Sequence, residues 1–306
     1  MSEARSPAAV RSWLFVPGDS ERKQAKALST AADALILDLE DSVEPAQLPA
    51  ARARVADLVG ARAGTGAQLW VRVNAPASGL LREDLHAVCA AGMPDGIVLP
   101  KVSAAGELAA VAEHLTALEA RLGSRALSTG LLVIATETPQ ALLSLPQYPA
   151  ALGAGSDARA RLHGLTWGAE DLSTALGALG KYQADGSLTF TLQLARTLCV
   201  VTAAALSVAA IDGVHADFRD GAGLERELAD ARRDGFSGKL AIHPEQIAPI
   251  NAAFTPTEAE LAHARRVVAA FAATAGADVA SLDGRMIDRP HLLQAQRLLA
   301  AARGGT

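Results

Sequence analysis

The sequence predicts an α/β fold, specifically a TIM (β/α)8 barrel with a C-terminal helical extension. Eight short runs rich in Val, Ile and Leu recur between residues 13 and 243, and each is followed by a longer Ala- and Leu-rich stretch with helical periodicity. The runs are continuously apolar rather than alternating, which is typical of a parallel sheet that is buried on both faces. Eight such units match the length of a TIM barrel.

The eight runs give the expected strands. The competing fold, an open doubly wound sheet, more often carries a glycine-rich phosphate-binding turn after its first strand. Here that turn reads PGDSERK, so the barrel is favoured. The apolar run at residues 198–211 is shorter than the roughly 20 residues that span a bilayer, and we expect a buried helix that leads into a strand. In chain order, the expected strands are residues 13–17, 34–38, 69–73, 96–100, 131–135, 163–167, 209–213 and 239–243.

We expect two parts along the chain. Residues 11–250 should form the barrel, and residues 251–306 should form the helical extension. In the extension, residues 255–275 read as one amphipathic helix, and residues 281–302 read as a loop followed by a second helix. The stretch GAGSDARARL at residues 153–162 reads as a surface loop.

The amino-acid composition limits the kinds of partner that the protein is expected to bind. The chain has 28 Lys and Arg against 33 Asp and Glu, no basic block and few aromatic residues, so nucleic acid is not an expected partner. Half of the residues are apolar, as in a globular protein with a large core. Cys89 and Cys199 have no metal-binding spacing, and we expect core cysteines in a reducing cytoplasm. No secretory signal or membrane span is expected.

Polar residues gather where the expected strands end, and in a TIM barrel the active site is built from the loops at these ends. The carboxylates among them greatly outnumber the bases, which suits a hard cation such as Mg²⁺. Glu137 and Asp171, at adjacent strand ends, are the expected ligands. In strand order the residues are Asp19; Asp38, Glu40 and Asp41; Arg72 and Asn74; Lys101; Glu137; Glu170 and Asp171; Asp212 and His215; and His243.

Several of these residues have a plainer interpretation. An isolated strand-end acid often caps the following helix, which is the alternative for Asp19, Asp41 and Glu170. Arg72 has the alternative role of neutralising the acids at residues 38–41, and Lys101 either neutralises acids or contacts a ligand. His243 is expected to be a satisfied histidine near a helix start.

Eight ordered motifs together resemble the citrate lyase beta-subunit-like proteins of the HpcH/HpaI aldolase superfamily, from Arg11 to about Ala301. They are RSWLFVPGD, ALILDLEDSV, LWVRVN, GIVLPKV, TETP, WGAEDL, AIHPEQI and GRMIDRPHLLQAQ. The resemblance implies a Mg²⁺-dependent barrel that commonly forms a homotrimer. By the same resemblance Glu137 and Asp171 hold the metal, Arg72 holds the keto-acid oxygens, and Asp288 is an acid/base residue lent to a neighbouring subunit.

The implied activity is reversible carbon–carbon cleavage of a 3-hydroxy-3-carboxyacyl thioester, of the citryl-, malyl- or citramalyl-CoA type, into a 2-keto acid and an acyl thioester. Arg72 and Lys101 would bind substrate, and Asp38 and Glu40 would position water or tune the proton transfer. Two alternatives stay open. One is a malyl-CoA-type thioesterase, and the other is a citrate lyase beta subunit that is active only with alpha and acyl-carrier protein partners.

The sequence departs from the family pattern at two places. Family members often carry a lysine shortly after the DLED motif, where this chain has Leu48. The residue before the glutamate of the strand-five motif is commonly Ile, where this chain has Thr136.

Overall fold

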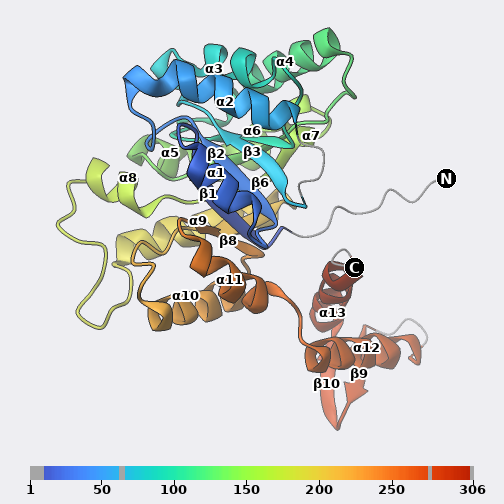
Figure 1. Ribbon diagram of the computed structural model, residues 1–306. Coiled ribbons are helices and arrows are strands. Elements are labelled where there is room, and N and C mark those ends of the chain that lie inside the picture. Colours follow the sequence, from blue (N-terminus) through green and yellow to red (C-terminus); the bar gives the residue numbers. More distant parts are fainter. Residues whose placement is uncertain (1–9, 62–65, 275–277, 304–306) are drawn as a thin grey trace.

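The fold is a closed barrel of eight parallel strands, as predicted. A computed structural model describes residues 10–61, 66–274 and 278–303 (Figure 1). Strand order around the barrel follows chain order, and the first strand also pairs with the eighth. Every expected strand is present, shifted by no more than two residues at either end. The strands are β1 (Ser12–Pro17), β2 (Ala34–Asp38), β3 (Gln68–Arg72), β4 (Gly96–Leu99), β5 (Gly130–Ile134), β6 (Leu162–Thr166), β7 (Ala209–Asp212) and β8 (Gly238–Ala241).

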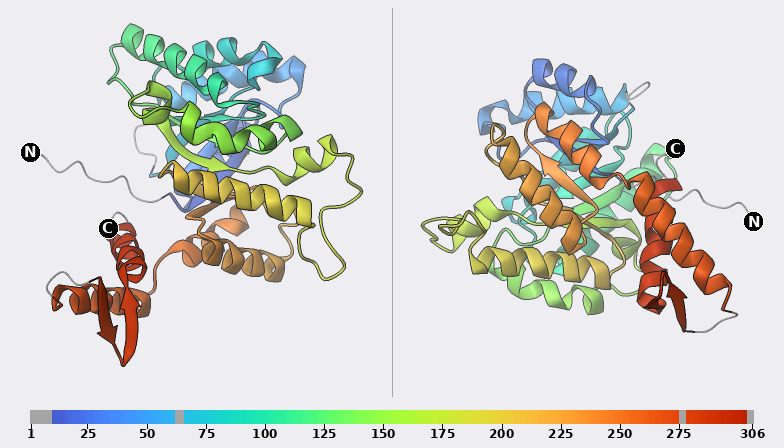
Figure 2. Two further views of the ribbon diagram at one scale, coloured as in Figure 1. Left: turned by 180° about the vertical axis from the view of Figure 1, so that it is seen from behind. Right: turned by 90° about the horizontal axis from the view of Figure 1, so that it is seen from below.

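Helices surround this barrel (Figures 1 and 2). The apolar run at residues 198–211 is the end of one helix followed by β7, as expected. None of the helices in the described ranges is long and apolar enough to cross a membrane. The helices are α1 (Glu21–Leu28), α2 (Leu48–Gly60), α3 (Leu81–Val88), α4 (Ala105–Leu122), α5 (Pro139–Ser144), α6 (Tyr148–Ala151), α7 (Asp157–Arg161), α8 (Ala169–Ala175), α9 (Phe190–Ala205), α10 (Gly221–Asp234) and α11 (Ile247–Phe254).

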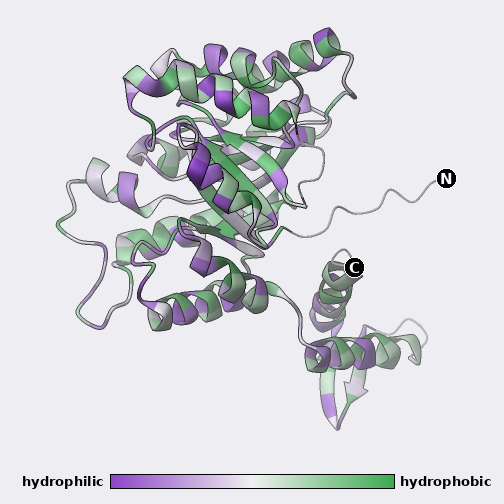
Figure 3. Ribbon diagram, in the orientation of Figure 1, coloured by the Kyte–Doolittle hydropathy of each residue, from purple (hydrophilic) through white to green (hydrophobic). Residues whose placement is uncertain are grey.

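Apolar side chains fill both the barrel interior and the layer between strands and helices, and Figure 3 shows hydrophobic strands within helices of mixed hydropathy. Inside the barrel, Trp13 and Trp70 meet edge to face with ring centroids 4.9 Å apart. Gly96 is required beside them, because a Cβ there would lie 2.1 Å from the Trp70 ring. Leu48, one of the departures from the family pattern, is a buried core residue of α2.

The prediction of a surface loop at residues 153–162 is wrong, because part of this segment is the short helix α7. Ser156 caps this helix by accepting a hydrogen bond from the Arg159 amide at 3.3 Å. Arg161 is 3% exposed and donates through both terminal nitrogens to Glu119 of α4, at 2.8 and 2.6 Å. A buried bidentate pair therefore ties this segment to the barrel wall.

The extension contains the two predicted helices and also a β-hairpin where a loop was expected. Helix α12 (Glu258–Ala272) is followed by the antiparallel strands β9 (Val279–Leu282) and β10 (Arg285–Asp288), and then by α13 (Arg289–Arg303). Asp283 and Gly284 turn the hairpin with φ of +53° and +75°. An Asp-Gly pair favours such a two-residue turn, so the expected loop is a hairpin.

The extension has its own small core, separate from that of the barrel. Helix α11 packs on the barrel and buries Ile250 completely, whereas α12, α13 and the hairpin share a cluster that includes Val267, Phe271 and Ile287. Between the two parts Arg232 pairs with Glu260 at 2.7 Å. In Figures 1 and 2 the extension lies on the other side of the barrel from the segment between α8 and α9, which follows β6.

Candidate active site

The carboxyl ends of β2 and β3 bring Asp38 and Arg72 into a buried bidentate pair. Arg72 donates through Nε and Nη2 to the two carboxylate oxygens of Asp38, both at 2.7 Å. Asp38 is 1% exposed and also accepts the backbone amides of Glu40 and Ser42. Burial raises the pKa of Asp38, but the Arg72 guanidinium outweighs it, so the pKa lies below its usual value. Asp38 therefore fixes the orientation of Arg72.

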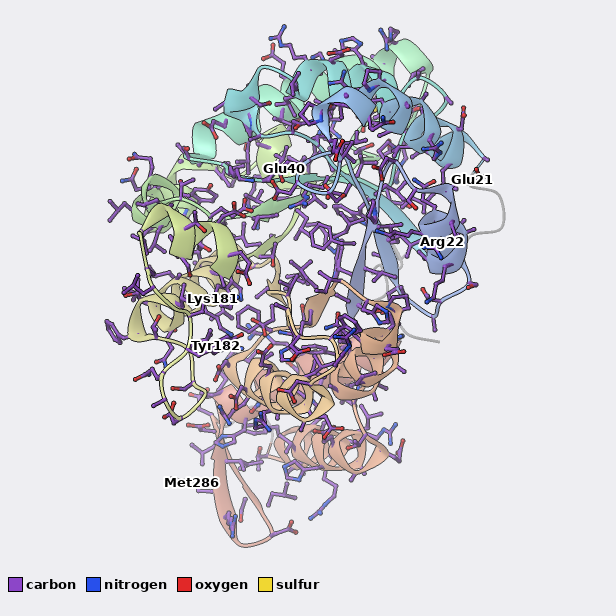
Figure 4. The ribbon with its side chains drawn as sticks, turned by 60° about the vertical axis from the view of Figure 1, so that its left-hand side comes forward. Glu21, Arg22, Glu40, Lys181, Tyr182 and Met286 are labelled. Atoms are coloured by element: carbon purple, nitrogen blue, oxygen red, sulfur yellow. The ribbon has the colours of Figure 1, made fainter. Side chains whose placement is uncertain are left out.

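The third nitrogen of Arg72 faces the remaining acids of the DLED motif. Nη1 lies 3.1 Å from Glu40 and 3.4 Å from Asp41. Lys101, at the end of β4, places its Nζ 2.6 Å from the other oxygen of Glu40 and 3.3 Å from Asp41. Burial raises the pKa of Glu40 above its usual value despite these two cations. Both bases thus lie among the acids, and Figure 4 shows Glu40 near the centre of this end of the barrel.

Glu137 follows β5 and is a buried carboxylate of the site. It is 2% exposed and accepts a hydrogen bond from the backbone amide of Lys101, a residue with a φ of +51°. Burial, together with the nearby Glu40 and Asp171, raises the pKa of Glu137 well above its usual value. No Lys or Arg side chain in the described ranges forms an ion pair with Glu137.

Asp171 lies in the first turn of α8, directly after β6. Its side chain is 35% exposed, and its Oδ1 lies 3.6 Å from Lys101 Nζ. Gly168 precedes this helix and is needed there, because a Cβ would approach the Cγ of Glu137 to 2.7 Å. The chain after β6 therefore packs directly against Glu137. We call Asp38, Glu40, Asp41, Arg72, Lys101, Glu137 and Asp171 the mouth cluster.

The mouth cluster has the donor set that a hard cation requires. Its five carboxylates exceed its two bases, and Glu137 is buried without a counter-charge of its own. Within the described part of the chain no three His, Cys, Asp or Glu side chains form an all-protein metal cage. Mg²⁺ needs only one or two carboxylates, since waters and substrate oxygens complete its shell. The Glu137 and Asp171 pair fits that requirement.

Two other predicted strand-end residues have structural partners at this end of the barrel. Asn74 donates to the Leu39 carbonyl at 3.0 Å and contacts the buried Asp84. His243 begins the short helix at Pro244–Gln246 as its N-cap and stacks on Phe218 at 4.3 Å, as its plainer interpretation proposed.

The capping interpretation fails for three acids. Ser20 occupies the N-cap position before α1, and Arg54 donates to the main-chain oxygen of Asp19 at 2.7 Å. Asp41 contacts Arg72 and Lys101 instead of a helix end. Glu170 lies inside the first turn of α8 and pairs with Lys181.

Asp212 and His215 do not face the mouth, although Asp212 ends β7 and His215 follows it. Asp212 is 2% exposed and pairs at 3.0 Å with Lys239 and with Arg196 of α9, in the layer between strands and helices. His215 is buried beside Glu227 of α10 at 2.9 Å. Asp212 is the last residue of its strand and its neighbour Ile211 faces the barrel interior, so the alternation of a strand turns Asp212 outward.

Asp288 is remote from the mouth of its own barrel. It is exposed at the end of β10 and pairs with His291. In Figure 4 Met286, of the same hairpin, lies at the opposite end of the molecule from Glu40.

Sequence reasoning missed two residues near the mouth cluster. The Phe15 ring lies under the Arg72 guanidinium, 4.8 Å from centroid to Cζ. Lys181 reaches Glu170 from the segment between α8 and α9, and Figure 4 shows it on the same side as Glu40. Phe15 had a usable signal, since it alternates with the buried Leu14 and Val16 along β1. Lys181 had none, because loop geometry is not readable from periodicity.

Together the fold and the mouth cluster define a class of protein. Residues 11–244 match the HpcH/HpaI aldolase/citrate lyase family, and the chain belongs to this family.

Relatives are similar over nearly the whole chain. A (3S)-malyl-CoA thioesterase of Cereibacter sphaeroides is 36% identical over 295 residues, which cover 95% of this chain and 94% of the relative. The mitochondrial citramalyl-CoA lyase of Homo sapiens is 33% identical over 297 residues, covering 95% and 85%. A crystal structure of CitE from Mycobacterium tuberculosis in complex with magnesium, acetoacetate and coenzyme A has 34% identity and a TM-score of 0.74, covering 97% of this chain and 99% of the other.

Proposed function

We propose that this protein is a Mg²⁺-dependent carbon–carbon lyase that cleaves a 3-hydroxy-3-carboxyacyl-CoA thioester into a 2-keto acid and an acyl-CoA. One observation carries the proposal: the buried Glu137 and the neighbouring Asp171 bring two carboxylates together beside Arg72 and Lys101. The family match and the relatives named for lyase activity on such thioesters support the same class of reaction.

Glu137 and Asp171 would hold the metal, with waters and substrate oxygens completing its shell. Mg²⁺ bound there would supply Lewis acidity to the oxygens of the keto acid. A bound cation would neutralise Glu137, whose carboxylate is desolvated and flanked by two further acids. Calorimetry with Mg²⁺ on Glu137→Gln and Asp171→Asn tests the assignment, and unchanged affinity in both variants would contradict it.

Arg72 would bind the keto-acid oxygens through Nη1, since its other two nitrogens are committed to Asp38. A guanidinium fixed in this way donates without reorganising when negative charge develops. Lys101 would add a second positive charge from the next strand. In this arrangement Asp38 orients Arg72, and Glu40 holds the two bases near each other and would also position water.

Asp288 of a neighbouring subunit would move the proton at the α-carbon of the thioester. Its own barrel mouth is remote, and the hairpin that carries it exposes Met286 at 78% and Val279 at 45%, which favours a homotrimer or a higher homo-oligomer. Mixing Asp288→Asn with an inactive Arg72 variant tests donation between subunits. Partial recovery of activity is expected on exchange, and no recovery despite proven exchange would mean that Asp288 serves its own barrel or does no chemistry.

A malyl-CoA-type thioesterase is the second candidate, favoured by the similarity to the Cereibacter sphaeroides enzyme. A citrate lyase beta subunit that needs alpha and acyl-carrier protein partners is the third. A coupled assay of the purified protein with Mg²⁺ and malyl-, citramalyl- or citryl-CoA, measuring keto acid and free CoA separately, decides among them. Keto acid without free CoA means a lyase, and free CoA without keto acid means a thioesterase that hydrolyses the hydroxyacyl thioester itself. Both products together mean cleavage followed by hydrolysis of the acyl-CoA, and no reaction with any substrate means the dependent subunit. The buried free cysteines, Cys89 and Cys199, fit a cytoplasmic location.

A further inference from the structure

A second group of charged residues lies behind the barrel wall, between β7, β8 and the helices. We call Arg196, Asp212, Glu227 and Lys239 the back cluster. Lys239 is 2% exposed and places Nζ 3.0 Å from both Asp212 and Glu227. Arg196 pairs with Asp212 at 3.0 Å and lies over the Phe236 ring at 4.5 Å. The Asp212 carboxylate is therefore fixed by two cations.

The Asp212 carboxylate also accepts a hydrogen bond from an uncharged donor. Trp167 Nε1 donates to Asp212 Oδ1 at 2.7 Å, although ion pairs already engage both oxygens of this carboxylate. The Trp167 side chain is 5% exposed, and Gly213 packs against its indole, because a Cβ there would lie 3.2 Å from Nε1. Asp212 and Gly213 therefore hold the Trp167 indole in place.

The backbone of Trp167 continues directly into the mouth. The next residue is Gly168, which packs on the Glu137 side chain and whose amide donates to Thr136 Oγ1 at 3.3 Å. Asp171 follows in the first turn of α8. Any displacement of the Trp167 backbone therefore moves both the surface that supports Glu137 and the helix start that carries Asp171.

We propose that Trp167 is a positioning residue for the metal site, through which Asp212 of the back cluster fixes Glu137 and Asp171 at the mouth. The inference rests on the proposed function, since it takes these two acids as the metal ligands. Partners of metal ligands commonly contribute 10–100-fold to metal affinity by fixing ligand orientation. Here the connection runs through one indole N–H and one peptide unit.

The test compares two tryptophans. Trp167→Phe removes the donor to Asp212 and keeps an aromatic ring. The control is Trp70→Phe, because Trp70 is also buried, at 1% exposed, and its Nε1 donates to Gln68 Oε1 at 2.9 Å. Mg²⁺ affinity by calorimetry and the Mn²⁺ spectrum by electron paramagnetic resonance are measured on both, with folding checked by circular dichroism. We expect roughly tenfold weaker binding in Trp167→Phe alone, with a changed Mn²⁺ spectrum.

A second pair of variants covers the case in which Trp167→Phe does not fold. Gly213→Ala presses on the Trp167 indole, and Gly130→Ala presses on Trp70, where a Cβ would lie 3.0 Å from the ring. Weaker metal binding in Gly213→Ala alone supports the inference. Wild-type affinity in both Trp167 and Gly213 variants, or equal weakening in the controls, overturns it. A wild-type protein that binds neither Mg²⁺ nor Mn²⁺ overturns instead the proposed metal site.

Discussion

The mouth cluster and the back cluster contain the same kinds of residue, one at the carboxyl ends of the strands and the other behind the barrel wall, yet their charges are arranged differently. The back cluster has two acids and two bases, and its central carboxylate contacts both bases at 3.0 Å. The mouth cluster has five acids and two bases, and Glu137 pairs with neither base. A buried acid by itself therefore does not mark an active site.

The protonation behaviour follows from this arrangement. Burial alone would raise the pKa of Asp212, but Lys239 and Arg196 outweigh it and the pKa falls below its usual value. At the mouth, burial prevails and the pKa values of Glu40 and Glu137 rise. An uncompensated carboxylate is costly to fold, so a ligand that neutralises it is the expected reason for its presence.

The largest expected effect is on stability, from a substitution that disrupts the back cluster. Asp212→Asn removes the carboxylate that Lys239 and Arg196 share and leaves them Glu227 and Asp234 as partners, which should lower the free energy of unfolding by up to about 3–5 kcal/mol. Urea denaturation of the metal-free protein measures it. Glu137→Gln removes a desolvated charge with no ion-pair partner, so its free energy of unfolding should equal or exceed that of the wild type. Similar destabilisation by both substitutions would remove the distinction between the clusters.

Arg72→Lys should have the next largest effect, on catalysis. A lysine ammonium cannot make two parallel bonds to Asp38 and also present a third donor, so kcat/KM should fall roughly 10²–10³-fold, equivalent to about 2.7–4 kcal/mol. Steady-state kinetics with the best substrate of the coupled assay gives the value. Near wild-type turnover with intact folding would mean that Arg72 only neutralises the acids, the alternative that the sequence left open.

The contributions of Asp212 in the back cluster and Glu40 in the mouth cluster to the pH dependence of stability should have opposite signs. Asp212 has a lowered folded pKa, so its contribution is complete above the unfolded value near 3.8 and is lost as the pH falls through the folded value. Glu40 has a raised folded pKa, so the wild type should lose stability as the pH rises from 4.5 through that value.

Urea unfolding of the wild type, Asp212→Asn and Glu40→Gln over a pH series in chelator isolates each contribution as a difference. The advantage of the wild type over Asp212→Asn should shrink in acid. Relative to Glu40→Gln, the wild type should instead gain stability in acid. Parallel pH curves for the wild type and either variant would contradict the assignment to that residue.

The smallest expected effect concerns Thr136, one of the departures from the family pattern. Its hydroxyl accepts the Gly168 amide at 3.3 Å, a bond that joins the ends of β5 and β6. Thr136→Val should therefore lower the free energy of unfolding by about 0.5–1.5 kcal/mol. Thermal denaturation detects it, with Thr138→Val, which removes the α5 cap at Ala141, as the matched control outside this contact.

Periodicity was sufficient to predict the barrel, because each buried strand is a short continuous run bounded by helix and loop signals. The position of Arg72, Lys101, Glu137 and Asp171 at one mouth followed from topology alone. The orientation of Asp212 did not, since a strand-end residue turns inward or outward according to a register that the sequence does not state. The hairpin at Val279–Asp288 was missed because its strands are short and weakly alternating.

The separate core of the extension has a consequence for how the chain folds. Because α12, β9, β10 and α13 bury their apolar residues among themselves, the barrel needs none of them to complete its own interior. During synthesis the barrel can close while residues 256–306 are still emerging from the ribosome. Two cores joined by few contacts should also exchange their amide protons as two cooperative units, with the smaller unit opening at a lower free energy than the barrel.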